Sequence, residues 1–224
     1  MGLSVSVSCQ KCNGVGSYLV GPEVAVRGLT IGQRVECECA EEFRETERNA
    51  KRSKLWNASG VPSRYQSARL TDLPEAAREA ITAWIGNPDG WIYLWGGVGT
   101  GKTHTAAAIV RETCRQMWTT LWASASDAAC KICERGGEAE LSRLRGCGVL
   151  VLDDLALRVP NAQQSEALYR LLDHRYGEQK PTIITSNVSV DDLAKVAGFD
   201  RIADRIREEA RGRIFASQKY RRAA

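Results

Sequence analysis

The sequence predicts an α/β fold in which a parallel sheet is sandwiched by helices, preceded by a small module of short extended pieces. Three observations predict it. Short apolar runs alternate with helical segments after about residue 60, a glycine-rich loop joins one such run to a helix, and four cysteines form two close pairs within the first 40 residues. Strands that alternate with helices imply crossover connections, and therefore a parallel sheet.

Length and composition are those of a folded chain. The protein has 224 residues, of which 43% are hydrophobic and 26% are charged, which suits one domain plus a small accessory module. No apolar run approaches the roughly 20 residues that cross a bilayer. The first residues lack the basic segment and long apolar core of a secretory signal. We therefore expect a cytoplasmic protein with no membrane contact.

The net charge of +4 is unevenly distributed. Residues 201–224 contain eight Arg or Lys residues against three acids, so the first 200 residues carry a net charge of −1. A basic end is typical of a surface that contacts phosphates. A solvated helix face explains the same composition, and composition alone favours that simpler interpretation.

Changes in pattern divide the chain into three parts. Residues 1–40 contain the paired cysteines and several glycines. Residues 41–60 are expected to form a helical linker, because EEFRETERNAKRSKLW is polar and lacks Gly and Pro, and the Ser-Gly-Val-Pro sequence at 59–62 then ends the helix. Residues 61–224 are expected to form the α/β domain.

The elements of this domain are expected in a regular order. Strands are predicted at residues 91–95, 118–123, 149–152, 182–185 and, at the end, 213–217. Helices are predicted at about residues 102–116, 127–135, 162–177 and 201–211. The run Val-Leu-Val-Leu at 149–152 is apolar on both faces, as a central parallel strand should be.

The glycine-rich loop carries the most specific motif. Gly96-Gly97-Val98-Gly99-Thr100-Gly101-Lys102-Thr103 fits G-x-x-x-x-G-K-[ST], between an expected strand and an expected helix. Glycines let successive backbone N–H groups turn towards a phosphate, and the helix N-terminus adds positive charge. Lys102 can reach the β- and γ-phosphates, and Thr103 can ligate Mg²⁺. Residues 97–103 are therefore predicted to bind a nucleoside triphosphate.

Two strand ends supply polar partners for this loop. The run 149–152 leads into Asp153 and Asp154, and burying carboxylates at a strand end is costly unless a cation compensates. We expect Asp153 to hold the Mg²⁺ shell and Asp154 to polarise the attacking water. Asn187 follows the strand at 182–185 and is expected at the same edge of the sheet, where it can orient the water and sense the γ-phosphate.

The N-terminal cysteines have the spacing of a metal site. Cys9-x-x-Cys12 and Cys37-x-Cys39 are two close pairs, and four thiolates can surround Zn²⁺ tetrahedrally. A 40-residue unit with little core can need that metal to fold. We expect a closed structural zinc site, with four unligated cysteines as the alternative. Cys130-x-x-Cys133 also has metal-like spacing, but it lies on an expected helix with no partner pair nearby, and Cys114 and Cys147 are isolated. These four cysteines are expected to be small buried hydrophobes. His104 follows the loop threonine, so it could lie near the nucleotide, but packing along its helix is the favoured interpretation.

With these motifs placed, the chain resembles the AAA+ ATPases of the DnaC/IstB group, which include bacterial and phage loaders of the replicative helicase. The resemblance covers residues 59–224. It is carried by SGVPSRY at 59–65, LVLDDL at 150–155, HRY followed by KPTIITSN at 174–187, and RIADRI at 201–206. The last segment resembles the box with the arginine finger, which implies that Arg205 reaches the nucleotide of a neighbouring subunit. A looser match implies a sensor 2 role for Arg221.

This resemblance implies an ATP-dependent helicase loader with slow, partner-stimulated hydrolysis. Its cofactors would be ATP, Mg²⁺ and Zn²⁺. Its partners would be a replicative helicase held by the zinc module, single-stranded DNA, and further copies of the chain in the ATP state. The implied catalytic set is Lys102, Asp153, Asp154, Asn187 and Arg205. The alternatives are an IstB-like transposition helper, which acts on duplex DNA and a transposase, and a non-hydrolysing nucleotide-binding zinc scaffold.

Overall fold

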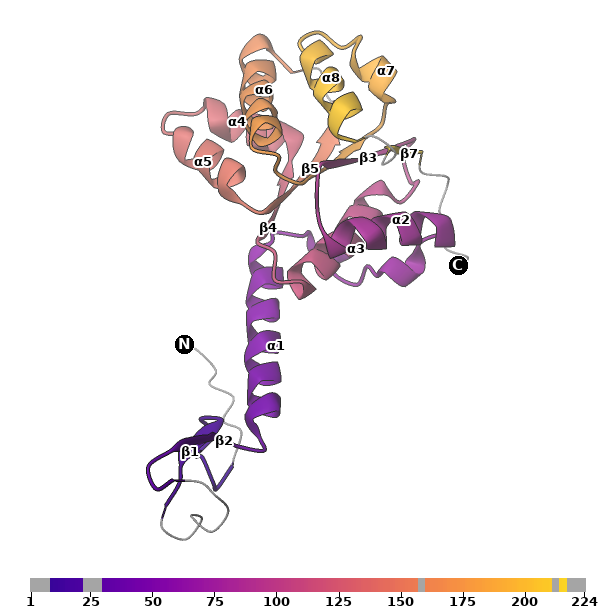
Figure 1. Ribbon diagram of the computed structural model, residues 1–224. Coiled ribbons are helices and arrows are strands. Elements are labelled where there is room, and N and C mark those ends of the chain that lie inside the picture. The colour runs from indigo at the N-terminus through magenta and orange to yellow at the C-terminus, as the bar shows by residue number, and fades with distance from the viewer. Residues whose placement is uncertain (1–8, 22–29, 157–159, 211–213, 217–224) are drawn as a thin grey trace. The chain divides into compact units, whose positions relative to one another are not determined.

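The computed structural model describes residues 9–21, 30–156, 160–210 and 214–216, and the chain forms two compact units (Figure 1). The first unit comprises Met1–Lys54 and the second Leu55–Ala224. In the first, β1 (Ser17–Leu19) and β2 (Arg34–Glu36) pair antiparallel, with Ser17 opposite Glu36. Helix α1 (Ala40–Ala58) follows and confirms the helix expected there. The division into a module, a linker and an ATPase domain at residues 40 and 60 stays a prediction.

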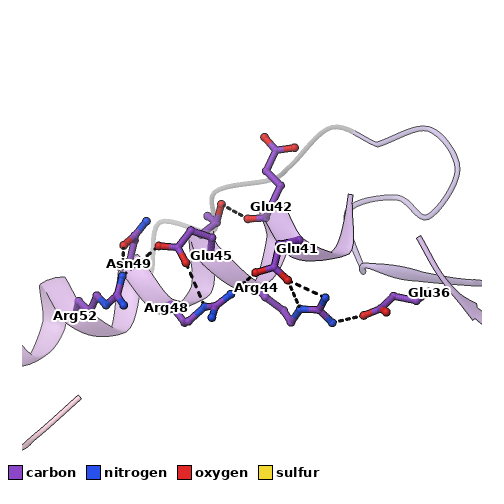
Figure 2. A network of polar contacts seen from close by, with 9 residues as sticks. Glu36, Glu41, Glu42, Arg44, Glu45, Arg48, Asn49 and Arg52 are labelled. Carbon is purple, nitrogen blue, oxygen red and sulfur yellow. Dashed lines mark hydrogen bonds and ion pairs between the residues drawn. The ribbon is translucent and has the colours of Figure 1, made fainter. Parts of the chain in front are cut away.

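Helix α1 is stabilised by charge rather than by burial along most of its length. Ala40 is the only residue of α1 that is buried, and the exposed side chains form a ladder of ion pairs (Figure 2). Arg44 contacts both Glu36 and Glu41, Arg48 contacts Glu41 and Glu45, and Arg52 contacts Glu45. Each exposed pair contributes less than about 1 kcal/mol, so the absence of Gly and Pro matters as much as the ladder.

The described residues of the second unit form a five-stranded sheet in the order β4-β5-β6-β3-β7, and every neighbouring pair is parallel. The sheet confirms the predicted fold class. Strand bounds are β3 (Trp91–Trp95), β4 (Thr120–Ser124), β5 (Val149–Leu155), β6 (Thr182–Ser186) and β7 (Ile214–Ala216). Strands β3 and β5 are buried on both faces, as the continuous apolar runs predicted.

Helices cover both faces of this sheet (Figure 1). Helices α2 (Glu75–Gly86) and α3 (Lys102–Arg115) pack on one face, with two short 3₁₀ turns, η2 (Ser63–Tyr65) and η3 (Leu70–Asp72). The other face carries α4 (Ala125–Cys133), α5 (Glu138–Gly146), α6 (Ala162–Gly177), α7 (Val190–Leu193) and α8 (Asp200–Glu209). Within the described residues, no helix has the length and apolar content that crossing a membrane requires.

Three helices were not expected from the sequence. Helix α2 buries Ile81, Trp84 and Ile85 from one stripe. Helix α5 buries only Leu141 and Leu144, which is too short an apolar pattern to separate from a loop. Helix α7 has four residues, Val190–Leu193, and depends on its Ser cap and on tertiary packing rather than on intrinsic helix stability.

The segment before α2 contacts β4 and α3 through backbone and side-chain groups. The carbonyl of Ser59 accepts a hydrogen bond from the backbone N–H of Trp122 at 2.7 Å. The Arg111 guanidinium of α3 donates to the carbonyl of Ala68 at 3.1 Å and lies 4.3 Å from the ring centre of Trp56. These contacts hold the segment that contains η2 and η3 against α3 and β4.

The buried guanidinium of Arg175 contacts the amino ends of two neighbouring strands, β5 and β6. Arg175 of α6 is fully buried, and it donates from Nε to the Thr182 hydroxyl at 2.9 Å. Its other hydrogen bonds go to the Cys147 sulfur and to carbonyls that precede β5 and β6, those of Leu144, Arg145, Cys147, Gly148 and Pro181. Burial lowers the pKa of Arg175, but a guanidinium stays charged in proteins. Arg175 therefore joins the amino ends of two strands through carbonyl oxygens.

We predict that Arg175→Met lowers the free energy of unfolding by about 3 kcal/mol or more, because several buried carbonyls lose their donor. The matched control is Arg170→Met on the same helix, whose side chain is 44% exposed and pairs with Glu138. That change should cost less than about 1 kcal/mol. Urea unfolding followed by circular dichroism measures both. Equal losses for the two variants would contradict the structural role of Arg175.

Candidate nucleotide site and cysteine cluster

The phosphate loop, residues 96–103, joins the end of β3 to the first turn of α3. Gly99 and Gly101 have φ angles of +80° and +88°, a left-handed conformation that glycine adopts without strain. Gly101 is the N-cap of α3, so the free N–H groups of the first helical turn belong to this loop. A Cβ at Gly97 or Gly99 would meet no atom of the described residues within 4 Å. The loop therefore borders open space that can take a phosphate.

Lys102 is held by the loop itself. Its side chain is buried, and Nζ donates to the carbonyls of Gly96 and Gly97 at 2.8 and 2.9 Å. Burial lowers the pKa of Lys102, while the nearby carboxylates of Asp154 and Asp153 act in the opposite direction. An ammonium held by two neutral carbonyls can exchange them for phosphate oxygens, which bind a cation more strongly.

Asp153 lies at the end of β5 and meets side chains from two other elements. Its Oδ1 accepts a hydrogen bond from the Thr185 hydroxyl of β6 at 2.5 Å and from the Thr103 hydroxyl of α3 at 3.3 Å. Burial raises the pKa of Asp153, and the Thr185 hydrogen bond opposes that rise. Thr103 and Asp153 together offer a hydroxyl and a carboxylate oxygen, which are ligands that Mg²⁺ accepts.

The sequence motifs did not predict the contact between Thr185 and Asp153. Its hydroxyl donates to Asp153 and accepts from the backbone N–H of Asp154 at 2.8 Å. The pairing of the strands explains this contact. Leu152 of β5 lies opposite Ile184 of β6, and the register shifts directly after that pair, so the single residue Thr185 contacts both Asp153 and Asp154. The sequence does show a hydroxyl residue, Thr185, at the end of a predicted strand. Its partner could be identified only once the order of the strands in the sheet was known.

Asp154 is directed differently from Asp153. It has φ of +57°, a conformation that is uncommon for a residue with a Cβ, and the register of β5 and β6 shifts between Leu152 and Leu155. Asp154 lines a cavity of about 290 Å³ together with Asp127, Cys130, Gln164 and Phe199. Asp154 therefore borders this cavity while its carboxylate still acts on Lys102, and its water-polarising role stays a prediction.

The remaining predicted residues fall in three places. Asn187 directly follows β6 and is half-buried, and within the described residues its side chain makes no hydrogen bond to the loop. Arg205 lies on α8, where its guanidinium is 4.1 Å from the ring centre of Tyr176. Arg221 lies outside the described residues. The roles assigned to Asn187, Arg205 and Arg221 stay predictions.

A larger cavity adjoins the phosphate loop. It has a volume of about 510 Å³, and its lining comprises Arg64, Tyr65, Ser67, Asp72, Leu73, Gly101, His104 and Thr105. His104 Nε2 and Asp72 Oδ2 are 2.8 Å apart. His104 therefore faces a cavity as well as a carboxylate, rather than serving helix packing alone. Tyr65 and Leu73 were not among the predicted site residues, because the sequence does not show that η2 and η3 fold beside α3.

The four N-terminal cysteines are brought together as predicted. All four sulfur atoms lie within 4.8 Å of one another, with Cys9 Sγ 3.6 Å from Cys37 Sγ and Cys12 Sγ 3.2 Å from Cys39 Sγ. The backbone N–H groups of Cys12 and Lys11 lower the pKa of the Cys9 thiol, which favours the thiolate that binds metal. Four converging sulfurs fit the donor set of a tetrahedral structural Zn²⁺ site.

The other cysteines divide into two kinds. Cys114 and Cys147 are buried, as expected for small hydrophobes, but Cys130 and Cys133 of α4 are exposed. The prediction of burial for those two was wrong, because α4 packs on the sheet through Ala125, Ala128, Ala129 and Ile132 instead. The two exposed thiols lie beside α6, and the Sγ of Cys130 accepts a hydrogen bond from the Gln164 side chain at 3.3 Å.

The sheet order, the glycine loop and the acid at the end of β5 define a P-loop nucleotide-binding protein with an AAA+ fold. The family of IstB-like ATP binding proteins matches residues 35–210, and the chain belongs to that family. It is therefore an ATP-binding protein of a family with ATPase character.

Individual relatives are of two kinds. Over 176 residues the chain is 25% identical to the replicative helicase loader DnaC of Escherichia coli (strain K12), covering 71% of each protein. Over 102 residues it is 37% identical to an ATP-binding protein of an insertion sequence in Mycobacterium tuberculosis, covering 43% of this chain and 40% of that protein. The crystal structure of DnaI matches with a TM-score of 0.62 at 22% identity, over 74% of this chain and 97% of that chain, and shows a shared fold.

We predict that Lys102→Ala weakens ATP binding about 10- to 100-fold, because the phosphates lose a charge-assisted hydrogen-bond donor. Titration with a fluorescent ATP analogue measures the change. Lys195→Ala, which removes an exposed lysine paired with Asp192, is the control and should bind as the unaltered protein does. Unchanged affinity in Lys102→Ala would contradict the placement of the triphosphate on this loop.

We also predict about one zinc ion per chain, lost when Cys9 and Cys12 are both changed to serine. The control changes the exposed pair, Cys130 and Cys133, to serine and should retain the metal. Elemental analysis of the purified proteins measures both. Purified protein without zinc, or equal zinc in the two double variants, would remove the metal assignment.

Proposed function

We propose that the chain is an ATP-dependent helicase loader, which binds the replicative helicase and places it on single-stranded DNA when replication begins in the cytoplasm. The observation that carries this proposal is the four-cysteine cluster in a unit separate from the nucleotide site. Such a unit gives the protein a second, metal-stabilised surface for holding a partner, and it resembles the helicase-docking modules of some loaders. The similarity to DnaC supports the same role.

In this proposal, ATP binds with its phosphates on residues 97–103 and its base in the 510 Å³ cavity beside Tyr65 and Leu73. Lys102 turns from the loop carbonyls to the β- and γ-phosphates. Thr103 and Asp153 hold Mg²⁺, which neutralises charge on the phosphates when it is bound. Thr185 keeps Asp153 aimed at that position by its 2.5 Å hydrogen bond.

Hydrolysis then acts as a timing switch. Asn187 orients the attacking water and Asp154 polarises it, while Arg205 enters the site of a neighbouring subunit and Arg221 acts as sensor 2. An arginine suits that role because its planar fork can meet two phosphate oxygens. Slow, partner-stimulated turnover is sufficient, since the loss of the γ-phosphate only has to change the assembly state.

Partner contacts follow from the same residues. ATP binding assembles copies of the chain side by side, because Arg205 of one copy completes the site of the next. The basic end, residues 201–224, contacts the phosphates of single-stranded DNA without reading its bases. The zinc module holds the helicase, and hydrolysis releases it.

A transposition helper of the IstB kind is the second candidate. It is favoured by the 37% identity to the insertion-sequence protein, and it would act on duplex DNA together with a transposase. A nucleotide-binding zinc scaffold that never hydrolyses ATP is the third. The cysteine module favours the loader over the transposition helper.

Affinity capture with the full chain separates these candidates. We expect the ATP-bound protein to capture a replicative helicase and not a transposase, and we expect ATPase activity to rise when helicase and single-stranded DNA are added. The Cys9 and Cys12 double serine variant should lose helicase capture and keep ATP binding. Capture of the transposase alone would favour the transposition helper. Helicase capture without any hydrolysis, and unaffected by Arg205→Ala, would favour the scaffold.

A further inference from the structure

Two arginines of α8 lie over two tyrosines of α6, helices that pack on the same face of the sheet (Figure 1). The Arg201 guanidinium is 5.5 Å from the ring centre of Tyr169, and the Arg205 guanidinium is 4.1 Å from that of Tyr176. The second pair is therefore in close stacking contact and the first is looser. Stacking on an aromatic face restrains a guanidinium without using its N–H donors.

The ion pairs of Arg205 are long, so its N–H groups form only weak hydrogen bonds. Nη2 lies 3.3 Å from Asp173 Oδ1 and Nη1 lies 3.8 Å from Glu208 Oε2. By comparison, Arg143 makes a bidentate pair with Glu140 at 2.7 and 2.8 Å, the usual length for such bonds. The Arg205 side chain is 31% exposed. Its outer N–H groups can therefore exchange these carboxylates for a stronger anion.

The ring under Arg205 is itself fixed. The Tyr176 hydroxyl donates to Glu208 Oε2 at 2.6 Å, so α8 supplies both the guanidinium and the carboxylate that orients the ring. Arg205 Nε is buried and has no hydrogen-bond partner among the described residues. The Nε side of the guanidinium is therefore restrained by the ring alone, whereas Nη1 and Nη2 make the long contacts to Glu208 and Asp173.

We propose that Tyr176 is a positioning residue for ATP hydrolysis, a platform that presents the Arg205 fork to the γ-phosphate bound by a neighbouring copy. Asp173 is the resting partner that the phosphate replaces. This inference rests on the proposed function, because it needs Arg205 to act in trans. Without the platform, Arg205 samples many rotamers, and the transition state bears the cost of ordering it.

The test compares Tyr176→Ala with Tyr169→Ala in the full chain with helicase and single-stranded DNA. Tyr169→Ala removes the looser stack on the same pair of helices and leaves Arg205 in place. We expect Tyr176→Ala to lower kcat about tenfold with KM for ATP unchanged, and Tyr169→Ala to keep kcat. Tyr176→Phe retains the ring without the hydroxyl and should keep kcat within about threefold of the unaltered protein. Thermal melting confirms that each variant is folded.

A mixing experiment identifies the subunit in which Tyr176 acts. Lys102→Ala subunits still donate Arg205, so they should restore hydrolysis to Arg205→Ala subunits, whose own nucleotide sites are intact. Adding Tyr176→Ala to the Lys102→Ala subunit should abolish that restoration, whereas adding Tyr169→Ala should not. A merely structural effect on the nucleotide site would not show this dependence on the donating subunit.

The outcomes separate this inference from the proposed function. If Arg205→Ala keeps the full kcat, Arg205 does not act as an arginine finger. Both the trans arrangement and the platform are then overturned. If Arg205→Ala lowers kcat but Tyr176→Ala leaves kcat unchanged or raises it, only the platform is overturned. Loss of ATP affinity in Tyr176→Ala would also overturn the platform, because a positioning residue for a neighbour's site leaves its own nucleotide binding intact.

Discussion

The carboxylate of Asp153 is the point on which the rest of the nucleotide site depends. It is buried at the end of a central strand, where an unpartnered charge would be costly. Hydroxyls from α3 and β6 satisfy it, those of Thr103 and Thr185. That arrangement requires three elements far apart in the sequence to meet at one edge of the sheet. It leaves Asp153 in contact with the loop threonine, where a magnesium ion can share its oxygen.

The second unit holds two buried charges and one partly exposed charge in three different ways. Arg175 is saturated by carbonyls and a hydroxyl, so it is fixed and serves the fold. Lys102 has two carbonyl partners that a phosphate can replace. Arg205 has long contacts to carboxylates and one close contact to a ring. Groups with weak partners can change them, and these are the groups assigned to chemistry.

Motifs with a local cause were predictable from the sequence. The phosphate loop needs glycine at left-handed positions, and the paired cysteines need only short spacings, so residues 96–103 and the four-cysteine cluster were found directly. The continuous apolar run that begins at Val149 likewise identified a central strand.

Contacts that depend on strand order were not predictable. Thr185 meets Asp153 because β5 and β6 are neighbours, and His104 lines a cavity because η2 and η3 fold beside α3. The exposure of Cys130 follows from which face of α4 meets the sheet. The left-handed turn at Asp154 also has no local signal, since it arises where the register of β5 shifts. Tertiary packing decides each of these, whereas local propensity does not.

A crystal structure of the full chain with magnesium and a non-hydrolysable ATP analogue tests the central claim most directly. The triphosphate should lie on residues 97–103, with the metal in the coordination sphere shared by Thr103 and Asp153. Lys102 should have left the carbonyls of Gly96 and Gly97 for phosphate oxygens. An analogue bound elsewhere, or a metal held without Asp153 while Lys102 stays on those carbonyls, would contradict the account.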